Sequence, residues 1–381
     1  MHTPPRICIL STVHLLHDVR LFQAEARTLA RAGFEVTVIA LEDTTDSETD
    51  GVRTIPLPAQ QNRLLRALQS IRVLRLALRQ RAELYAIHDP ELLPAAVLLR
   101  LLTRRPVVYD VHEDVPAAIR SRLWLPRGLR PLTAWLYRFV ERLSLPFIAG
   151  LSLADHAYEK YYRGLRFETV LNYPLMTYAD LYRPAGPSLG ARPVLVYTGA
   201  IMRLRGLFEM LYLVQRLRRT FPSILLRLVG PVDSELVAER DEVVSRLGLA
   251  PNVEFTGLVS HTQVHGYILD ADVCLALLHP DPNYLRSLPT KMFEYMMMGR
   301  PVVVSDFPMW KDIVEDAECG YAVDPLDGDA AANAVQTLLG DDDRRVRMGE
   351  AGRRAVLERY SWEGEGRRLV GLYRELLGEE P

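Results

Sequence analysis

The segment LPTKMFEYMMMGRPVVVSDFP, residues 288–308, combines the start of a helix with two charged side chains whose spacing suits the binding of an anion. Pro289 and Thr290 stand where the helix is expected to begin, and a helix N-terminus offers free N–H groups and a positive dipole end to a diphosphate. Lys291 opposes that dipole, so a bound anion would relieve the conflict. Glu294, one turn later, could accept hydrogen bonds from a vicinal diol such as ribose. The competing interpretation is a solvated loop in which Glu294 pairs with Lys291.

Polar side chains in the N-terminal half also follow predicted strands. The motif YDVHEDVP places His112 and Glu113 just past the carboxyl end of one strand, and His88 and Asp89 stand at the end of another. Side chains on such loops often carry function, so these four are candidates for a binding or catalytic site. The competing interpretation is a structural histidine at 112 and a simple loop cap at 88 and 89.

A third polar group follows the first predicted strand and contains His17, Asp18 and Arg20. Ligands of doubly wound sheets bind beyond the carboxyl ends of the strands, so this position turns the group toward the expected ligand. Arg20 is expected to hold a phosphate or an acidic acceptor, because a guanidinium forks onto two oxygens.

Alternating short apolar runs and helical stretches must position these residues. The runs predict strands, and helices are expected over residues 18–33 and about 290–298, each followed or ended by a glycine. Strand, helix and strand at this spacing indicate parallel sheets. Strands are predicted at 6–11, 35–40, 84–88, 106–111, 147–153, 194–199, 225–230, 253–257, 273–278 and 302–306.

The stretch YRPAGPSLGARP, residues 182–193, separates two series of these units and is rich in proline and glycine, as interdomain linkers are. We therefore predict an α/β protein with two doubly wound Rossmann-like domains facing each other across a ligand cleft. The predicted boundaries are 1–182 for the N-terminal domain, 183–193 for the linker and 194–361 for the C-terminal domain, with a last helix at about 362–381 packing back onto the N-terminal domain.

Length and composition bound the class of protein. The chain has 381 residues, enough for two domains, and 49% of its residues are hydrophobic and 25% charged, as in ordinary globular proteins. No apolar run is long enough to span a membrane, and the N-terminus lacks the pattern of a secretory signal. Three widely spaced cysteines, Cys8, Cys274 and Cys319, favour the reducing cytoplasm over a disulfide framework.

The sequence lacks the motifs that are typical of several other classes of ligand. No G-x-G-x-x-G sequence follows a predicted strand and no P-loop sequence is present, which disfavours a nicotinamide cofactor and a P-loop nucleotide site. No spacing typical of metal ligands occurs, and the run Asp341–Asp343 is expected to be a charged connection between helices. A pI near 6.5 offers no broad basic surface for nucleic acid.

Two stretches without acidic residues, 63–81 and 115–140, carry arginines beside leucine and aromatic side chains. Arginines in such surroundings suit the surface of an anionic bilayer, so both stretches are candidates for peripheral membrane contact. The competing interpretation is an apolar face that packs on the protein core, with solvated arginines opposite.

The motifs taken together resemble those of family 4 glycosyltransferases, which have the GT-B fold. Within that family they resemble a subgroup that is often found in surface-polysaccharide gene clusters. The similarity runs over nearly the whole chain, which makes it far more specific than any one loop. The segments that carry it are HDVRLFQAEARTLARAGFEVTVIA (17–40), HDPELLPAA (88–96), YDVHEDVP (109–116), VYTGAIMRLRGL (196–207), VEFTGLVS (253–260), LDADVCLALL (269–278), 288–308 and YSWEGEGRRLVGLY (360–373).

The resemblance implies a donor site for a nucleotide-sugar in the C-terminal half. It places Glu294 on the donor ribose, while Arg286 stands where the family has another glutamate on the sugar hydroxyls. Arg205 takes the place of a family lysine on the diphosphate, and Arg203 could substitute for a family arginine that this chain lacks. The implied donor-binding residues are Gly199, Arg203, Arg205, Gly257, Val259, Arg286, Pro289, Thr290, Lys291, Met292 and Glu294.

The resemblance also implies the reaction. A sugar would pass from the nucleotide-sugar to an acceptor hydroxyl with retention at the anomeric carbon, in polysaccharide or glycoconjugate biosynthesis. His112 would lie near the 6-hydroxyl of the donor sugar and the acceptor, and Arg205 and Lys291 would stabilise the leaving diphosphate, so no metal or other cofactor is expected. The acceptor side would comprise His17, Asp18, Arg20, His88, Asp89 and Glu113.

Two other functions fit the same residues. One is a nucleotide-sugar epimerase, and the other is a noncatalytic nucleotide-sugar-binding partner in a glycan assembly, suggested by Arg286 and by Ala200 in place of the family arginine. The partners expected for the transferase are a nucleotide-sugar and a glycan, lipid-linked glycan or small-molecule acceptor. Its expected location is the cytoplasm or the inner face of the membrane.

Overall fold

The computed structural model describes residues 4–42, 51–59, 63–121, 125–183 and 192–379, and of residues 63–68 and 121 only the backbone. The chain divides into two compact units: unit 1 comprises Met1–Asn172 and Trp362–Pro381, and unit 2 comprises Tyr173–Ser361. The boundary lies ahead of the expected residue 182. Residues 184–191 of the expected linker lie outside the described residues.

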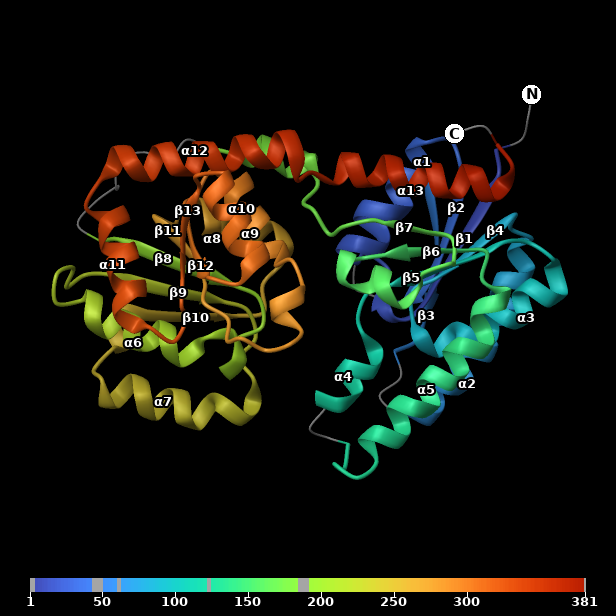
Figure 1. The fold of residues 1–381 in the computed structure, drawn as a ribbon, viewed down its shortest axis with the longest axis horizontal. Helices are drawn as coiled ribbons and strands as arrows, with labels where there is room; N and C mark the ends of the chain where they lie inside the picture. Colours follow the sequence, from blue (N-terminus) through green and yellow to red (C-terminus); the bar gives the residue numbers. More distant parts are fainter. Residues whose placement is uncertain (1–3, 43–50, 60–62, 122–124, 184–191, 380–381) are drawn as a thin grey trace. The chain divides into compact units, whose positions relative to one another are not determined.

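Unit 1 is built on a seven-stranded, fully parallel sheet in the order β3-β2-β1-β4-β5-β6-β7 (Figure 1). The strand order reverses between β1 and β4, and doubly wound sheets bind ligands at this switch point. Strands β4 to β6 are buried along their whole length, as in sheets covered on both faces. The strands are β1 (Arg6–Leu15), β2 (Glu35–Leu41), β3 (Val52–Leu57), β4 (Leu84–Ile87), β5 (Val107–Val111), β6 (Gly150–Leu153) and β7 (Phe167–Thr169).

Two strands of this sheet were not predicted, and both lie at its edges. Strand β3 contains Pro56, which cannot donate a ladder hydrogen bond and is therefore tolerated chiefly on edge strands. Strand β7 has three residues and is too short to give a hydrophobic pattern. The edges of the sheet therefore escape a prediction that relies on apolar runs.

The helix expected over residues 18–33 begins as a π-helix, η1 (Val19–Ala26), and continues as α1 (Arg27–Arg31). The side chain of Asp18 caps it by accepting hydrogen bonds from the N–H groups of Arg20 and Leu21. Turns of π-helix are frequent at functional sites, because they re-aim side chains within a helix. This helix carries two of the buried charged side chains of unit 1, Arg20 and Glu25.

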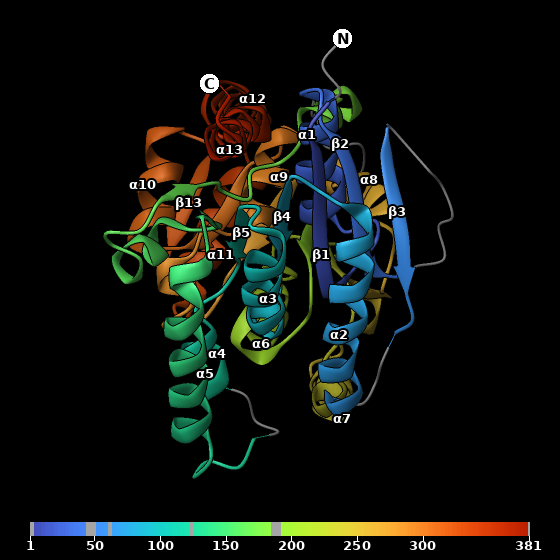
Figure 2. The same cartoon turned by 90° about the vertical axis from the view of Figure 1, so that its right-hand side faces the viewer.

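The other helices of unit 1 pack in two groups. Helices α2, α3 and α5 lie side by side (Figure 2), and α13 packs against η1, α1 and strands β6 and β7. The α-helices are α2 (Arg63–Gln80), α3 (Leu93–Thr103), α4 (Val115–Ser121), α5 (Arg130–Ser144) and α13 (Trp362–Leu377), and the 3-10 turns are η2 (Pro90–Leu92), η3 (Leu145–Phe147) and η4 (His156–Tyr161). Residues 362–377 thus belong to unit 1 although they end the chain.

Unit 2 repeats the strand pattern with a six-stranded parallel sheet in the order β10-β9-β8-β11-β12-β13. Its order reverses between β8 and β11, so this is the second switch point. Strand β13 was not predicted, and it is a short, half-buried edge strand. The strands are β8 (Val194–Thr198), β9 (Leu225–Val229), β10 (Val253–Gly257), β11 (Val273–Ala276), β12 (Val302–Ser305) and β13 (Gly320–Val323).

The helices of unit 2 enclose a single large cluster of buried hydrophobic side chains. Helix α6 packs against α11, and α9 packs against α12 (Figure 1). The α-helices are α6 (Leu207–Leu217), α7 (Val237–Arg246), α8 (His261–Leu269), α9 (Thr290–Met297), α10 (Pro308–Asp316), α11 (Gly328–Leu339) and α12 (Asp342–Arg359), and the 3-10 turns are η5 (Met176–Leu181), η6 (Arg203–Arg205), η7 (Ser234–Leu236), η8 (Ala250–Asn252) and η9 (Tyr284–Arg286). Asp341 caps α12, as expected for a charged connection between helices.

Among the described residues, no helix combines the length and the apolar character that a membrane crossing requires.

Candidate functional site

In unit 2, two glycines shape the backbone turn that follows β8 at the switch point. Gly199 has φ +107° and Gly206 has φ +78°, which both belong to the left-handed region that favours glycine. A Cβ at Gly206 would lie 1.9 Å from the carbonyl oxygen of Leu277, and one at Gly230 would lie 2.2 Å from that of Gly199. The turn from β8 into α6 is therefore packed too closely for a side chain at 206, and the end of β9 approaches this turn too closely for a side chain at 230.

Two cations converge on the bare side of Gly199. A Cβ placed on Gly199 would lie 3.3 Å from the Nζ of Lys291 and 3.6 Å from the Nη1 of Arg205. The Nε of Arg205 donates to the hydroxyl of Tyr284 at 3.3 Å. The pair thus presents two positive charges beside backbone that has no side chain, which is an arrangement suited to an anion.

The ammonium of Lys291 is buried and has no hydrogen-bond partner among the described residues. It lies 3.8 Å from the centre of the Tyr197 ring, so the π face of that ring stabilises its charge. Burial and the nearby guanidinium of Arg205 hold the pKa of Lys291 well below its usual range, although Glu294 acts in the opposite direction. The ion pair between Lys291 and Glu294 that the solvated-loop interpretation required is not formed.

The first turn of α9 lies at the same place. Pro289 is the N-cap and gives the helix no side-chain cap, and the amides of Thr290 and Lys291 have no partner among the described residues. The N–H of Met292 donates to the carbonyl of Pro289 at 3.0 Å, and its side chain is fully buried in the core. Two of the three amides expected to face a diphosphate are therefore free, and the third is not.

Glu294 is positioned by a histidine pair that the sequence interpretation missed. His261 and His265 lie one turn apart on α8, and the Nε2 of His261 is 3.3 Å from an oxygen of Glu294. Burial raises the pKa of Glu294, but the hydrogen bond from His261 and the charges of His261, His265 and Lys291 outweigh it, so the net pKa lies below its usual range. Burial lowers the pKa of His265 to about 4. The i, i+4 spacing in HTQVH was the available signal.

The other expected donor residues are more loosely placed. Arg203 is ion-paired with Glu239 and lies 4.6 Å from the centre of the Phe208 ring, so its charge is directed to the surface. Arg286 is exposed on η9, with no ion pair or hydrogen bond to any described residue. Gly257 ends β10 with φ +71° and nothing near its Cβ position, and Val259 packs partly against the core.

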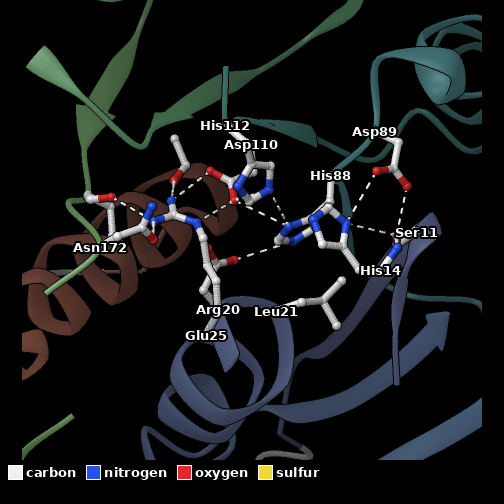
Figure 3. A network of polar contacts seen from close by, with 12 residues as sticks. Ser11, His14, Arg20, Leu21, Glu25, His88, Asp89, Asp110, His112 and Asn172 are labelled. Atoms are coloured by element: carbon white, nitrogen blue, oxygen red, sulfur yellow. Dashed lines mark hydrogen bonds and ion pairs between the residues drawn. The ribbon is translucent and has the colours of Figure 1, made fainter. Parts of the chain in front are cut away.

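In unit 1, three side chains at the ends of β4 and β5 meet in a triangle of polar atoms (Figure 3). The Nδ1 of His88 lies 3.0 Å from the Nε2 of His112, and both nitrogens face Oδ2 of Asp110, at 3.2 and 3.0 Å. His88 and Asp110 are buried, whereas the side chain of His112 is 20% exposed. His88 and His112 were predicted as site residues, and Asp110, two residues before His112, was missed.

Arg20 is surrounded by internal acceptors. Its Nε and Nη2 donate to the two oxygens of Asp110 at 3.0 and 2.9 Å, and its Nε lies 2.9 Å from Glu25. Its Nη1 donates to the carbonyl of Val170 at 3.0 Å and to Oδ1 of Asn172 at 2.6 Å. The guanidinium thus holds the carboxylate of Asp110 in place, rather than standing open for a phosphate or an acidic acceptor as expected.

Asp89 organises the C-terminal part of β1. Its Oδ2 accepts hydrogen bonds from the hydroxyl of Ser11 at 2.7 Å and the amide of Thr12 at 2.6 Å. Its Oδ1 lies 3.3 Å from Nδ1 of His14, whose ring centre is 5.1 Å from that of His112. His14, which the sequence interpretation missed, therefore stands beside His112 and is 26% exposed.

Burial and neighbouring charges shift the pKa values of several groups in this network. Burial favours protonation of Asp110, but the charge of Arg20 and the charge and hydrogen bond of His112 hold its pKa well below its usual range. Burial and the nearby Asp110 hold the pKa of Glu25 well above its usual range, and burial lowers the pKa of His88 to about 3. The network therefore contains ionised Asp110 beside neutral His88.

The remaining acceptor-side residues are dispersed. Asp18 caps η1, and the ring of His17 lies 4.9 Å from that of Phe22. Glu113 is exposed at the rim of a cavity of about 450 Å³, which Tyr158 and Arg138 also line. Val111 and Glu113, the two neighbours of His112 in the chain, line this cavity, but His112 itself does not.

Two family models match the chain in sequence. The one described as glycosyl transferase 4-like domain matches residues 20–170, and the one described as glycosyl transferases group 1 matches residues 180–355. The alpha-D-kanosaminyltransferase of Streptomyces kanamyceticus is 24% identical over 283 residues, which make up 71% of this chain and 71% of that protein. The similarity thus extends over both units.

Solved structures share the fold. The sucrose-phosphate synthase of Thermosynechococcus elongatus matches with a TM-score of 0.76 at 21% identity, covering 98% of this chain and 99% of that one. HepE of Anabaena, solved in complex with UDP and glucose, matches with a TM-score of 0.73 at 16% identity, covering 97% and 100%. The two family models, the doubly wound sheets and these matches together show that the chain is a glycosyltransferase of family 4 with the GT-B fold.

Proposed function

We propose that the enzyme transfers a sugar from a nucleoside diphosphate sugar with retention at the anomeric carbon, and that unit 2 binds the donor at the Gly199 turn and the first turn of α9. The observation that carries the proposal is the buried, unpartnered ammonium of Lys291 beside Arg205. A diphosphate would supply the missing partner of this ammonium. The complex of HepE with UDP supports a uracil nucleotide as the first donor to test.

The proposed role of the cations follows from the place where negative charge develops during the reaction. As the bond between the anomeric carbon and the diphosphate oxygen breaks, negative charge grows on that oxygen. The cations of Lys291 and Arg205 and the amides of Thr290 and Lys291 are already aimed at this place, so they stabilise the transition state without reorganising. We propose that the leaving diphosphate needs no metal ion or other cofactor.

Retention follows in this proposal from attack on the same face that the diphosphate leaves. The acceptor oxygen forms its bond to the anomeric carbon, and the departing phosphate oxygen takes the acceptor proton. No protein base is required for the proton balance. Glu294, held by His261, is placed one turn from Lys291 and would accept hydrogen bonds from the ribose hydroxyls.

The acceptor would bind to unit 1, where His112 and His14 are partly exposed. We propose an acceptor of polysaccharide or glycoconjugate biosynthesis. A lipid-linked acceptor agrees with the surface of α5, where a row of large apolar side chains is 48–61% exposed: Leu132, Trp135, Leu136, Phe139 and Leu143. This row, flanked by exposed Arg138 and Arg142, would bring the enzyme to the inner face of an anionic membrane.

The stretch 63–81 does not share that surface. Val73 and Ala77 are fully buried, and Leu74 and Leu78 pack against the core of unit 1. These four side chains pack on the protein, whereas Ile71 of the same stretch is 46% exposed. The side chains of residues 63–68 and residues 122–124 lie outside the described part of the chain.

The decisive experiment replaces Lys291 by methionine, which keeps an unbranched stem of four heavy atoms and removes the terminal ammonium. We expect kcat to fall by about 100- to 1000-fold, the loss typical for one preorganised electrostatic group. Lys311→Met is the matched control, because Lys311 is half exposed and pairs with Glu315. Transfer is measured with UDP-, GDP-, ADP- and TDP-sugars. A Lys291→Met enzyme that keeps wild-type kcat and nucleotide affinity would refute the proposed donor site.

A further inference from the structure

We propose that His88, Asp110 and His112 form a binding site for a divalent transition-metal ion, of which Zn²⁺ is the type. The site lies within unit 1, and nothing in the proposed donor chemistry of unit 2 uses it. Its failure or success is therefore independent of the donor site proposed in unit 2, although His112 also belongs to the proposed acceptor side.

The spacing of the three donor atoms fits one ion. The edges of the triangle are 3.0 Å between His88 Nδ1 and His112 Nε2, 3.2 Å between His88 Nδ1 and Asp110 Oδ2, and 3.0 Å between His112 Nε2 and Asp110 Oδ2. Ligands at about 2.0–2.2 Å from Zn²⁺, separated by roughly 90–110°, lie about 3.0–3.5 Å from one another. An ion just above the plane of the triangle would reach all three atoms without any movement of the backbone.

Hydrogen bonds satisfy the three polar atoms of the triangle less completely than a bound cation would. If both His88 Nδ1 and His112 Nε2 carried a hydrogen, two donors would face each other at 3.0 Å. With one hydrogen between them, a single N–H must serve both the other nitrogen and Asp110. A metal ion accepts the lone pairs of all three atoms at once, because its ligands must be deprotonated.

The surroundings supply the outer partners that metal ligands commonly have. The second nitrogen of His88, Nε2, lies 3.3 Å from Oε2 of Glu25, the arrangement in which a carboxylate orients a ligating histidine. Arg20 donates to both oxygens of Asp110 and so fixes the third ligand.

The ligand set also indicates which ion would bind. Two imidazole nitrogens and one carboxylate oxygen favour Zn²⁺, Co²⁺ or Ni²⁺ over Mg²⁺ and Ca²⁺, which prefer oxygen alone. Three protein ligands leave further positions for water or for a hydroxyl of a bound molecule. His112 is the most exposed member of the set, so the ion would enter from its side.

The test measures metal binding directly on the full-length chain without a histidine tag. After removal of metal with a chelator, Zn²⁺ affinity is determined by competition with a chromophoric chelator, and Co²⁺ is added to observe its ligand-field spectrum. We expect the wild type to bind and His112→Ala to bind at least tenfold more weakly. His156→Ala, a change at an exposed histidine of unit 1, should bind as the wild type does.

Two further variants show whether the metal binds at this triangle and at no other place in the chain. Glu25→Gln leaves all three ligands in place and should weaken binding by about 10- to 100-fold, the usual effect of losing an outer carboxylate. His261, His265 and Glu294 form a second possible ligand set in unit 2, so His265→Asn should leave the metal bound in unit 1. Absence of Zn²⁺ and Co²⁺ binding in the wild type, or equal affinity in His112→Ala, would overturn the proposal and leave a hydrogen-bonded network.

Discussion

At the scale of single residues, charge without a partner is the clearest mark of the donor site. Lys291 was recognisable in the sequence because a cation in the first turn of a helix is unfavourable there. The residues that tune it were not recognisable. His261 and His265 come from another helix and meet Glu294 only through the fold. In unit 1, Asp110 was missed for the same reason, since it meets Arg20 only through the fold, whereas Glu25 lies on the same helix as Arg20 and was also missed.

The lowered pKa of Lys291 has a consequence for ligand binding. A diphosphate binds the ammonium form, so affinity should be greatest at lower pH and should fall as the pH rises through the depressed pKa of the free enzyme. Calorimetry with a nucleoside diphosphate checks this over a range above the second phosphate pKa of about 6, so that the ligand stays ionised. Lys291→Met should bind weakly with no such pH dependence. A wild-type affinity that stays constant up to the ordinary pKa of lysine would contradict the shift.

Glu294 allows a second prediction at this scale. Glu294→Gln keeps the shape of the side chain but removes the charge that accepts hydrogen bonds from a diol. We expect nucleotide binding to weaken by about 1–3 kcal/mol, the range for a hydrogen bond to a charged group. The ribose hydroxyls can be tested separately, because a 2′-deoxynucleotide should lose less affinity on the mutant than on the wild type. Equal losses on both proteins would mean that Glu294 does not contact the ribose.

At the scale of elements, the strands beside the two switch points were predicted within a few residues, whereas edge strands and the π-helix were not. Buried parallel strands are continuous apolar runs, which single sequences display well. Strand β3 contains a proline, β7 is very short, and β13 is only half buried, so none shows such a run. The π-helix η1 has ordinary helical residues, so its sequence does not distinguish it from an α-helix, and the buried pair of Arg20 and Glu25 lies within it.

The turn between β8 and α6 can be tested through its glycines. Gly206→Ala would place a Cβ 1.9 Å from the carbonyl oxygen of Leu277, a backbone atom that cannot move aside cheaply. Gly257→Ala is the matched control, because Gly257 has a similar positive φ but open space around its Cβ position. The control should cost about 1–2 kcal/mol of unfolding free energy for the left-handed backbone alone. Gly206→Ala should lower the free energy of unfolding, measured in urea, clearly more than the control does. Equal decreases in the two variants would argue against the close packing of this turn.

Helix α5 carries the membrane prediction. Its apolar row should bind vesicles that contain anionic lipid but not neutral ones, and salt should weaken the binding because it screens the arginines. Co-sedimentation of Trp135→Ser combined with Phe139→Ser should leave the protein in the supernatant. Leu258→Ser is the control, since Leu258 is 84% exposed but lies on unit 2. Equal recovery of the wild type with both vesicle types would mean that the row serves another purpose.

At the scale of the whole molecule, the chain crosses from one unit to the other twice, and the second crossing ties the C-terminus to unit 1. The sequence predicted that a last helix packs back onto the N-terminal domain, but it could not supply the contacts. The Nε1 of Trp362 donates to the hydroxyl of Thr28 at 2.8 Å, and a carboxylate oxygen of Glu365 accepts from the amide of Leu171 at 2.9 Å. Leu372 is buried in unit 1 as part of the same helix.

This arrangement predicts that a change at residue 372 destabilises a sheet whose strands all lie far earlier in the sequence. Leu372→Ala should lower the stability of unit 1 by about 2–5 kcal/mol, the usual cost of removing a buried leucine. Hydrogen exchange resolves where the loss falls: amide protection should decrease in β6 and β7 and stay unchanged in β8 to β12. Arg367→Ala, an exposed position on the same helix, should alter neither. A loss of amide protection confined to unit 2 would contradict the assignment of α13 to unit 1. A uniform loss of protection would show that the two units unfold as one.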